Sequence, residues 1–501
     1  MKTVDDVAGP NVDDQESRPD PFVVAITVVV ALGLWIRPLV ASLWLDELGT
    51  WWVVKDGLQD AIDRAIEFHG QSPAYYVTAW ASTTLFGKSE LALRLPSLIA
   101  MAVATVLVYR LVLRLFDRET ARLALFTFVA SGPIAFAASD ARPYACAIAA
   151  LLAATVALVR WLDEGADRWG IAFVLLAGLA IWFHYLVALG FIAHAVYAAV
   201  RIRAGESRVS WGRLALAAAG LLVLVLPLAA QFASLWSRRG SLTTPDDPSP
   251  PDLFLALVAP VGPVALLLGA LLARATGAIS LSRVPVRQHA LALLAPWLIV
   301  PPTFLFFLSV GTPLKLMSAR YYISAVPAAA IFLAWAIRAI EPSTARRLVA
   351  GVLAICSVAA YGESLKYGED WASAASFVRS SAGPDTPVFI HPAFVESSQI
   401  DWLRDPVLRS YLMSPVAFYP MTGDLRLVPY LVEEEGIEYM EGELLEATTT
   451  DRFLLVTRYP QVPWATWMIG MLRDEGWDAE VVAVAGLIQI WEFALDGGAP
   501  L

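Results

Sequence analysis

Long apolar stretches separated by short polar connections make up most of the first 361 residues of this 501-residue chain. The mean hydropathy is +0.60, and 16% of the residues are charged, against roughly 25% in soluble domains. Each stretch is near the ~20 residues that a helix needs to cross a bilayer. We therefore expect a polytopic α-helical membrane protein with about eleven transmembrane helices, from the apolar stretches 21–45, 91–113, 120–138, 143–162, 169–184, 185–200, 214–236, 253–272, 289–310, 321–340 and 348–361.

The basic residues in the connections predict the orientation, because cytoplasmic loops carry an excess of Lys and Arg. With a cytoplasmic N-terminal tail (residues 1–20), the inner segments hold 18 of the 28 basic residues that precede Gly362. The stretch 21–45 is too long for the apolar core of a signal peptide and is expected to be a retained span. We expect a multi-pass protein of the plasma membrane, and an odd number of spans places residues 362–501 outside.

Residues 362–501 differ in composition from the preceding transmembrane part, residues 21–361. They contain 8 Lys and Arg against 22 Asp and Glu, a net charge of −14, whereas the first 361 residues carry +4. Strand-like runs alternate with helix-like segments, the former at 387–390, 453–456 and 481–493 and the latter at 397–404 and 463–475. We predict a C-terminal extracytoplasmic α/β domain that shapes access of the acceptor. The acidic run from Glu433 is expected to be a solvated helix or loop.

Unusual polar side chains collect in the segments expected on the outer face. The first outer loop, 46–90, opens with Asp46 and Glu47 directly after the first span. Hydrocarbon penalises ionised carboxylates by several kcal/mol, so this pair is expected to face water or a polar cavity. The other outer connections supply cations, a histidine and aromatic residues: Arg142, Tyr144, His184, Tyr185, Lys315, Arg320 and Tyr321.

This combination suits chemistry on a lipid-linked phosphate. Arg142, Arg320 and Lys315 are candidates to hold the phosphate by charge-assisted hydrogen bonds and to stabilise it as a leaving group. Asp46 or Glu47 is the candidate base for an acceptor hydroxyl. Consecutive helical residues point about 100° apart, so one of the two is expected to face the cavity, and the sequence leaves open which. We expect no metal site, because no usual ligand spacing is present, and no cofactor or nucleic-acid partner.

The order of these motifs resembles a known family. Leu45-Asp46-Glu47 is followed by HGQSPAYY at 69–76 and FGKSELALRLPS at 86–97, and later by ARPY at 141–144, FHY at 183–185 and Arg320-Tyr321. This pattern looks like the GT-C glycosyltransferases, in particular the protein mannosyltransferase and aminoarabinose transferase-like branch called glycosyltransferase family 39. The resemblance implies a GT-C type fold and a substrate pocket that includes His69, Gln71, Tyr75, Tyr144, His184, Tyr185 and Tyr321.

The resemblance also implies an activity. It is inverting, metal-independent transfer of a sugar from a polyprenyl-phosphate donor to an acceptor hydroxyl at the outer face, with Asp46 as base and Glu47 in support. The doubled proline of the mannosyltransferases is Ser72-Pro73 here, and no lumenal domain interrupts the spans. The sugar, and whether the acceptor is a lipid, a protein or a glycan, therefore do not carry over.

Two other classes of function remain open from the sequence. A transporter or flippase of a lipid-linked or envelope substrate would usually carry ionisable groups near the bilayer midplane, whereas the unusual charges here are expected at the outer boundary. An assembly protein would use its outer domain to bind a partner. Structural roles are also open, since Asp46 and Glu47 suit a helix N-terminus, and Arg142, Arg320 and the tyrosines suit interfacial anchoring.

Overall fold

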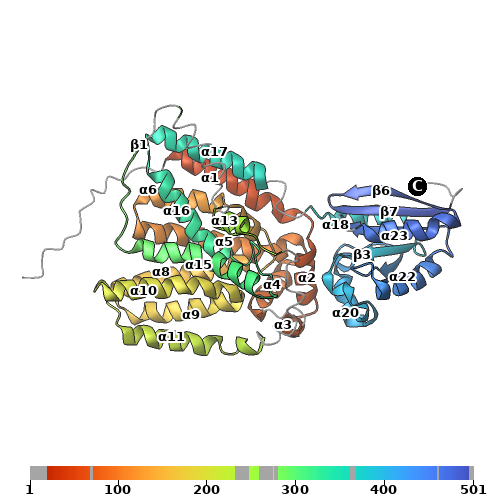
Figure 1. Cartoon of the computed structure of the whole chain (residues 1–501), viewed down its shortest axis with the longest axis horizontal. Helices are drawn as coiled ribbons and strands as arrows, with labels where there is room; N and C mark the ends of the chain where they lie inside the picture. Colours follow the sequence, from red (N-terminus) through yellow and green to blue (C-terminus); the bar gives the residue numbers. More distant parts are fainter. Residues whose placement is uncertain are drawn as a thin grey trace, which may run out of the picture.

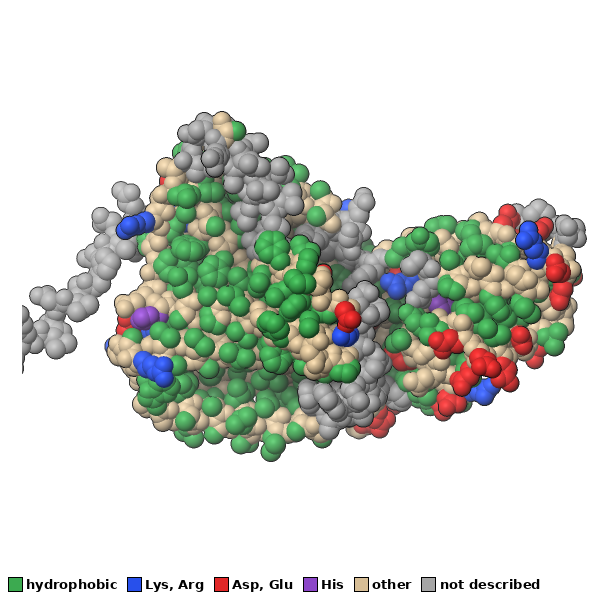
Figure 2. Space-filling model, in the orientation of Figure 1, with side chains coloured by type: hydrophobic (Ala, Val, Ile, Leu, Met, Phe, Trp, Pro, Cys, Tyr) green, Lys and Arg blue, Asp and Glu red, His purple; other side chains and the backbone are tan. Residues whose placement is uncertain are grey.

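The computed structural model describes residues 20–67, 72–231, 247–258, 275, 280–361, 368–459 and 462–495. A helical body and a smaller part built on a β-sheet lie side by side along the long axis of the molecule (Figure 1). Hydrophobic side chains cover the helical body, whereas acidic side chains gather on the sheet-containing part (Figure 2). The surface chemistry therefore changes along the molecule as the composition changes along the sequence.

Six helical segments among the described residues are long and apolar enough to cross a membrane, or seven if one bent pair counts as a span. The six are α1 with η1 and η2 (Pro21–Ala31, Leu32–Ile36, Arg37–Val40), α5 (Glu90–Leu115), α8 (Tyr144–Glu164), η3 with α10 (Tyr185–Leu189, Gly190–Arg203), α15 (Ala290–Gly311) and α17 (Ser343–Tyr361). The bent pair is α6 (Arg118–Val129) with α7 (Gly132–Ala138). Shorter helices fill the rest of the body: α9 (Asp167–Phe183), α11 (Trp211–Val225), α13 (Pro250–Val258), η6 (Ile323–Ala325) and α16 (Val326–Arg338).

The prediction of a helical membrane protein is confirmed, whereas the number of eleven spans is not established. The stretch 120–138 is not one straight helix, because α6 and α7 meet at an angle of 67°. The stretches 214–236 and 253–272 each end outside the described residues. The stretch 21–45 remains helical only to Val40, and the chain is not helical from there to Trp44.

Helix α8 forms the centre of the body and contacts α5 and α9. Its side chains are buried around most of the helix, as expected for a core helix rather than an amphipathic one. A helix of 21 residues is about 31 Å long, so Tyr144 and Glu164 lie at opposite ends of the body. At the Glu164 end, Arg114, Arg160 and Arg168 pair with this carboxylate.

The segment predicted to be the first outer loop, here called the first outer segment, folds as three helices, α2 (Leu45–Val54), α3 (Leu58–Glu67) and α4 (Pro73–Phe86). Side chains of these helices share one buried cluster with the sheet-containing part, including Trp51, Trp52 and Tyr76 from the loop and Trp371 and Phe418 from beyond residue 362. Trp51 and Phe418 meet edge to face with ring centroids 5.2 Å apart. The first outer segment and the C-terminal part therefore have a common core.

The C-terminal part has a five-stranded mixed sheet in the order β4-β3-β5-β7-β6. The strands are β3 (Pro387–His391), β4 (Asp424–Leu427), β5 (Arg452–Arg458), β6 (Trp477–Ala485) and β7 (Ile488–Leu495). β3 runs parallel to β4 and β5, and β7 runs antiparallel to β5 and β6. The helices are α18 (Trp371–Ser381), η7 (Val395–Ser398), α19 (Ile400–Arg404), α20 (Pro406–Leu412), α21 (Ser414–Phe418), α22 (Glu434–Ala447), α23 (Pro463–Leu472) and η8 (Arg473–Glu475). The predicted mixture of strands and helices is confirmed.

Alternating side chains give this sheet two buried faces. Val388 and Ile390 of β3 join the cluster shared with the first outer segment, whereas Phe389 joins a second cluster with Met440 of α22 and Trp464 of α23. Because successive strand residues point to opposite faces, one face of the sheet packs against the first outer segment and the other against α22 and α23. The sheet therefore anchors the outer part against the helical body.

We predict that the C-terminal part and the Glu164 end of α8 lie on opposite sides of the membrane. The test uses single cysteines in a chain whose Cys146 and Cys356 are replaced by serine: Glu441→Cys on exposed α22 and Arg168→Cys, where the native side chain is 75% exposed. A membrane-impermeant maleimide should label position 441 in intact cells and position 168 only after permeabilisation. Equal labelling of the two positions in intact cells would contradict the prediction.

Candidate functional site

The candidate site starts where the first span ends, in a short non-helical segment before α2. Asp46 is the second residue of α2, and Trp44 is its N-cap. The Trp44 amide donates to Glu47 Oε2 at 3.3 Å, which closes a capping arrangement at the helix start. The direction of the Asp46 side chain therefore depends on how the residues just before it are held.

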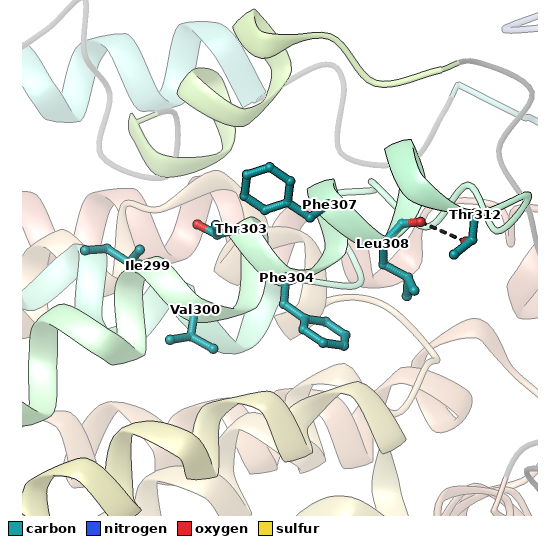
Figure 3. Close-up of a pocket in the computed structure, with 7 residues that line it drawn as sticks. All are labelled: Ile299, Val300, Thr303, Phe304, Phe307, Leu308 and Thr312. Atoms are coloured by element: carbon teal, nitrogen blue, oxygen red, sulfur yellow. Dashed lines mark hydrogen bonds between the residues drawn. The ribbon is translucent and has the colours of Figure 1, made fainter.

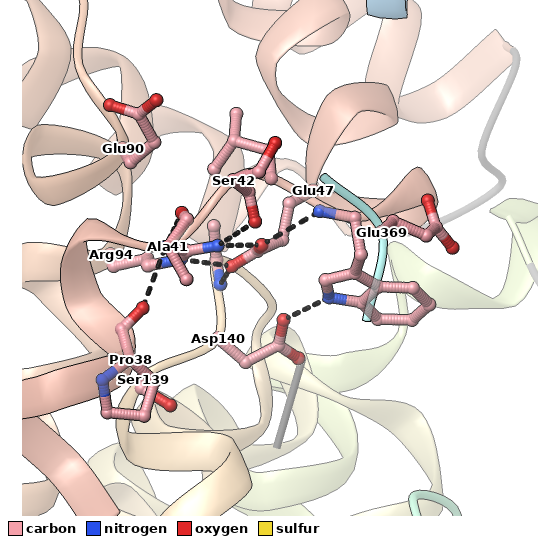
Figure 4. Close-up of polar contacts among 12 residues, drawn as sticks. Pro38, Ala41, Ser42, Glu47, Glu90, Arg94, Ser139, Asp140 and Glu369 are labelled. Atoms are coloured by element: carbon pink, nitrogen blue, oxygen red, sulfur yellow. Dashed lines mark hydrogen bonds and ion pairs between the residues drawn. The ribbon is translucent and has the colours of Figure 1, made fainter. Parts of the chain in front are cut away.

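Glu47 is fully buried and forms an ion pair with the equally buried Arg94 of α5 (Figure 4). Arg94 Nε lies 2.7 Å from Glu47 Oε1, and Nη2 lies 2.5 Å from Oε2. The remaining guanidinium hydrogens are donated to backbone carbonyls 2.6–3.1 Å away, those of Pro38, Leu39, Ala41 and Ser42. All the donors of Arg94 are thus used to hold the end of the first span.

Asp140 completes this buried arrangement from the connection before α8. Its Oδ1 accepts from the Trp44 indole at 2.9 Å, and the amide of the next residue, Ala141, donates to Glu47 Oε1 at 2.9 Å. Both oxygens of Glu47 are therefore occupied by partners inside the protein. Glu47 is therefore fully enclosed, and Asp46 is the partly exposed carboxylate of the pair.

Asp46 lies between two arginines that come from distant parts of the sequence. Its side chain is 27% exposed, and its Oδ2 is 2.9 Å from Arg320 Nη1 and 3.9 Å from Arg142 Nε. Arg142 is buried, and among the described residues its Nε donates no hydrogen bond. The structure therefore brings together three of the residues predicted for the site: one carboxylate and two guanidiniums.

Aromatic residues predicted for the pocket surround this cluster. The His184 ring lies 5.2 Å from that of Tyr144 and 6.4 Å from that of Tyr321, and the Arg320 guanidinium lies 5.2 Å over the Tyr321 ring. Within the described residues, His184 Nδ1 is buried without a hydrogen-bond partner.

The other residues predicted for the site make different contacts or lie outside the described residues. Lys315 pairs with Asp247 and donates to the Ser309 carbonyl at 2.9 Å, and Tyr185 donates to Gln231. Tyr75 is fully buried, 5.8 Å ring to ring from Tyr76. His69 and Gln71 lie outside the described residues.

Several site residues were not singled out from the sequence. Tyr76 is buried within the electrostatic reach of Arg142 and Asp46. From the C-terminal part, burial raises the pKa of Glu396, and the negative charge of Asp46 adds to the rise. The sequence does mark Arg94 as unusual, because it is an ionisable residue inside an apolar stretch. The residues beyond 362 gave no comparable signal.

Apolar hollows open onto the sides of the helical body. One of about 490 Å³ lies between α4, α5, α8 and α9 and includes Phe183 and Cys146, which are near His184 and Tyr144 in the chain. Another, of about 480 Å³, is lined by residues 299–312 on α15 (Figure 3). Neither is lined by Asp46. Within the part of the chain that the structure describes, no group of three or more His, Cys, Asp or Glu residues could hold a metal ion.

Comparison with known proteins shows a family resemblance over part of the chain and a similar fold over nearly all of it. Residues 70–230 match the family described as dolichyl-phosphate-mannose-protein mannosyltransferase. The chain is similar to the crystal structure of ArnT from Cupriavidus metallidurans bound to undecaprenyl phosphate, with a TM-score of 0.56 and 13% identity over 95% of this chain and 98% of that one. The chain therefore has the GT-C type of fold, and its residues 70–230 resemble the mannosyltransferase family.

The apo form of the same ArnT gives a TM-score of 0.55 at 13% identity, over 94% of this chain and 97% of that one. No curated protein matches the chain significantly. At this identity the structural likeness establishes the fold, and the family match extends over the segment that carries Arg94, Arg142 and His184. The predicted resemblance is confirmed over residues 70–230, and the structural match supports the predicted fold.

We predict that the Arg94–Glu47 pair is essential to the stability of the GT-C fold here. Arg94→Met leaves the Glu47 carboxylate buried without its cation, which should cost roughly 3–5 kcal/mol of unfolding free energy. The measurement is denaturant unfolding of the purified protein in detergent. Arg168→Met, at an exposed ion pair, serves as the control and should cost less than about 1 kcal/mol. Similar losses in the two variants would contradict the assignment.

Proposed function

We propose that this protein transfers a sugar from a polyprenyl-phosphate donor to an acceptor hydroxyl at the outer face of the plasma membrane, with inversion at the anomeric carbon. The observation that carries the proposal is the partly exposed Asp46 carboxylate flanked by Arg142 and Arg320. The undecaprenyl phosphate in the similar ArnT structure supports a donor of this class. The proposed topology has a cytoplasmic N-terminus, about eleven spans and an extracytoplasmic C-terminal domain.

Two cations next to one another suit the leaving group. A donor phosphate carries negative charge that increases as its bond to the sugar breaks, and guanidinium groups stabilise it through charge-assisted hydrogen bonds. Among the described residues the Nε–H of buried Arg142 donates no hydrogen bond, and it is one donor available to the phosphate. Arg320 at present pairs with Asp46 at 2.9 Å, and a phosphate entering beside it would compete for the same guanidinium.

Asp46 is proposed as the general base. It takes the proton of the acceptor hydroxyl as the oxygen attacks the anomeric carbon, and the bond from that carbon to the phosphate oxygen breaks. Polyprenyl phosphate leaves with the bonding electrons, and the new glycosidic bond forms on the opposite face of the sugar. Glu47 has the supporting role, because Arg94, Ala141 and Trp44 already occupy its oxygens. His184, whose Nδ1 has no hydrogen-bond partner among the described residues, is a candidate to bind a substrate hydroxyl.

The base is tested by Asp46→Asn, which keeps the volume of the side chain and removes its basicity. We expect release of polyprenyl phosphate from a radiolabelled polyprenyl-phosphate sugar to fall by roughly 10²–10⁴-fold. Asp60→Asn, at an exposed position of α3 in the same outer segment, should leave turnover unchanged. Full activity of a folded Asp46→Asn protein would exclude the proposed base, and transport of an intact donor would favour a flippase.

The phosphate site is tested by Arg320→Gln. Loss of one hydrogen bond to a charged group is worth ~1.5–3 kcal/mol, so kcat/KM for the donor should fall roughly 10- to 100-fold. Arg168→Gln at the far end of the body is the matched control. An unchanged kcat/KM for the donor in Arg320→Gln would place the phosphate elsewhere.

A further inference from the structure

Groups of the C-terminal domain hold the chain just before Asp46. The Leu43 amide donates to the Tyr419 hydroxyl at 2.8 Å, and the Leu45 amide donates to Glu369 Oε2 at 3.1 Å. In the opposite sense, the Ala372 amide donates to Ser42 Oγ at 3.2 Å. Residues that follow position 368 thus reach the backbone of the catalytic helix at its first residue.

Glu369 is buried and has several polar partners. It is 3% exposed, its Oε2 also accepts from the Trp371 indole at 3.0 Å, and its Oε1 lies 2.8 Å from Arg458 Nε at the end of β5. A buried carboxylate is retained only where a cation and hydrogen-bond donors compensate it. Here one of those donors belongs to the outer segment, so the carboxylate joins the two parts of the molecule.

The Leu45 amide is one of the first amides of α2, which have no acceptor within the helix. Without Glu369 this partly buried N–H would lose its partner, and the favourable interaction of a carboxylate with a helix N-terminus would be lost as well. The consequence passes directly to Asp46, because neighbouring Cα atoms are only about 3.8 Å apart. Asp46 would then be free to shift relative to Arg320 and Arg142.

We propose that Glu369, supported by Arg458, is a positioning residue that fixes the start of α2 so that the Asp46 carboxylate meets the acceptor hydroxyl. The C-terminal domain is thereby part of the catalytic unit and not only a cover over it. This inference rests on the proposed function, in which Asp46 is the base.

The test compares Glu369→Ala and Glu369→Gln in the full-length protein with the same radiolabelled donor. A displacement near 1 Å costs on the order of 100-fold in rate, so Glu369→Ala should lower kcat roughly 10- to 100-fold with the KM of the donor unchanged. Glu369→Gln should recover part of this loss, because its amide oxygen still accepts from Leu45. Glu441→Ala, an exposed position of α22, is the control and should match the wild type.

A double variant tests whether Glu369 acts through Asp46. In the Asp46→Asn background, Glu369→Ala should cause no further loss, because the group that Glu369 positions no longer acts as a base. If the two losses multiply, or if KM rises while kcat is unchanged, the positioning role is overturned. An active Asp46→Asn protein would instead overturn the proposed function itself.

Should Glu369→Ala fail to fold, Tyr419→Phe provides the same test with little change in volume. It removes the hydroxyl that accepts from Leu43 at 2.8 Å and donates to Glu90 at 2.9 Å. A lower kcat with an unchanged KM is expected, and wild-type kcat in Tyr419→Phe together with wild-type kcat in Glu369→Gln would overturn the proposal.

Discussion

The buried ion pair between Glu47 and Arg94 organises the region on which the rest of the site depends. Taking two charges out of water is costly, and here the cost is offset because every donor of the guanidinium and both oxygens of the carboxylate have partners. The pair ties the end of the first span to α5 and to the connection before α8. Asp46 lies immediately beside this fixed point and keeps its own carboxylate open to one side.

Two distant parts of the sequence form one structural unit around Asp46. Trp51 and Trp52 of α2 share a core with α18 and one face of the sheet. Glu369 and Tyr419 add hydrogen bonds from the C-terminal part to the backbone before Asp46. Removing residues 365–501 would therefore expose the core of the first outer segment, so single substitutions are the cleaner way to ask how this domain contributes to the reaction.

Much of this arrangement could be predicted from the sequence, because its signals are local. Apolar length predicts helices, alternation predicts strands, and the motif order predicts Asp46, Arg142 and Arg320 at one site. What could not be predicted depends on contacts between distant residues. Arg94 was identified within a motif, but nothing local says that it faces Glu47. Glu369 is one acidic residue among 22 in its part of the chain, and only the fold brings it to Leu45. The number of spans could not be predicted from apolar length alone, because one apolar stretch bends between α6 and α7.

The most direct test of the proposed site is an experimental structure of the protein with polyprenyl phosphate bound. We expect the phosphate to contact the guanidiniums of both Arg142 and Arg320 at hydrogen-bond distance, about 2.7–2.9 Å, with the Asp46 carboxylate facing the same chamber. A phosphate bound away from both arginines, or an Asp46 side chain turned away from it, would contradict the proposed site.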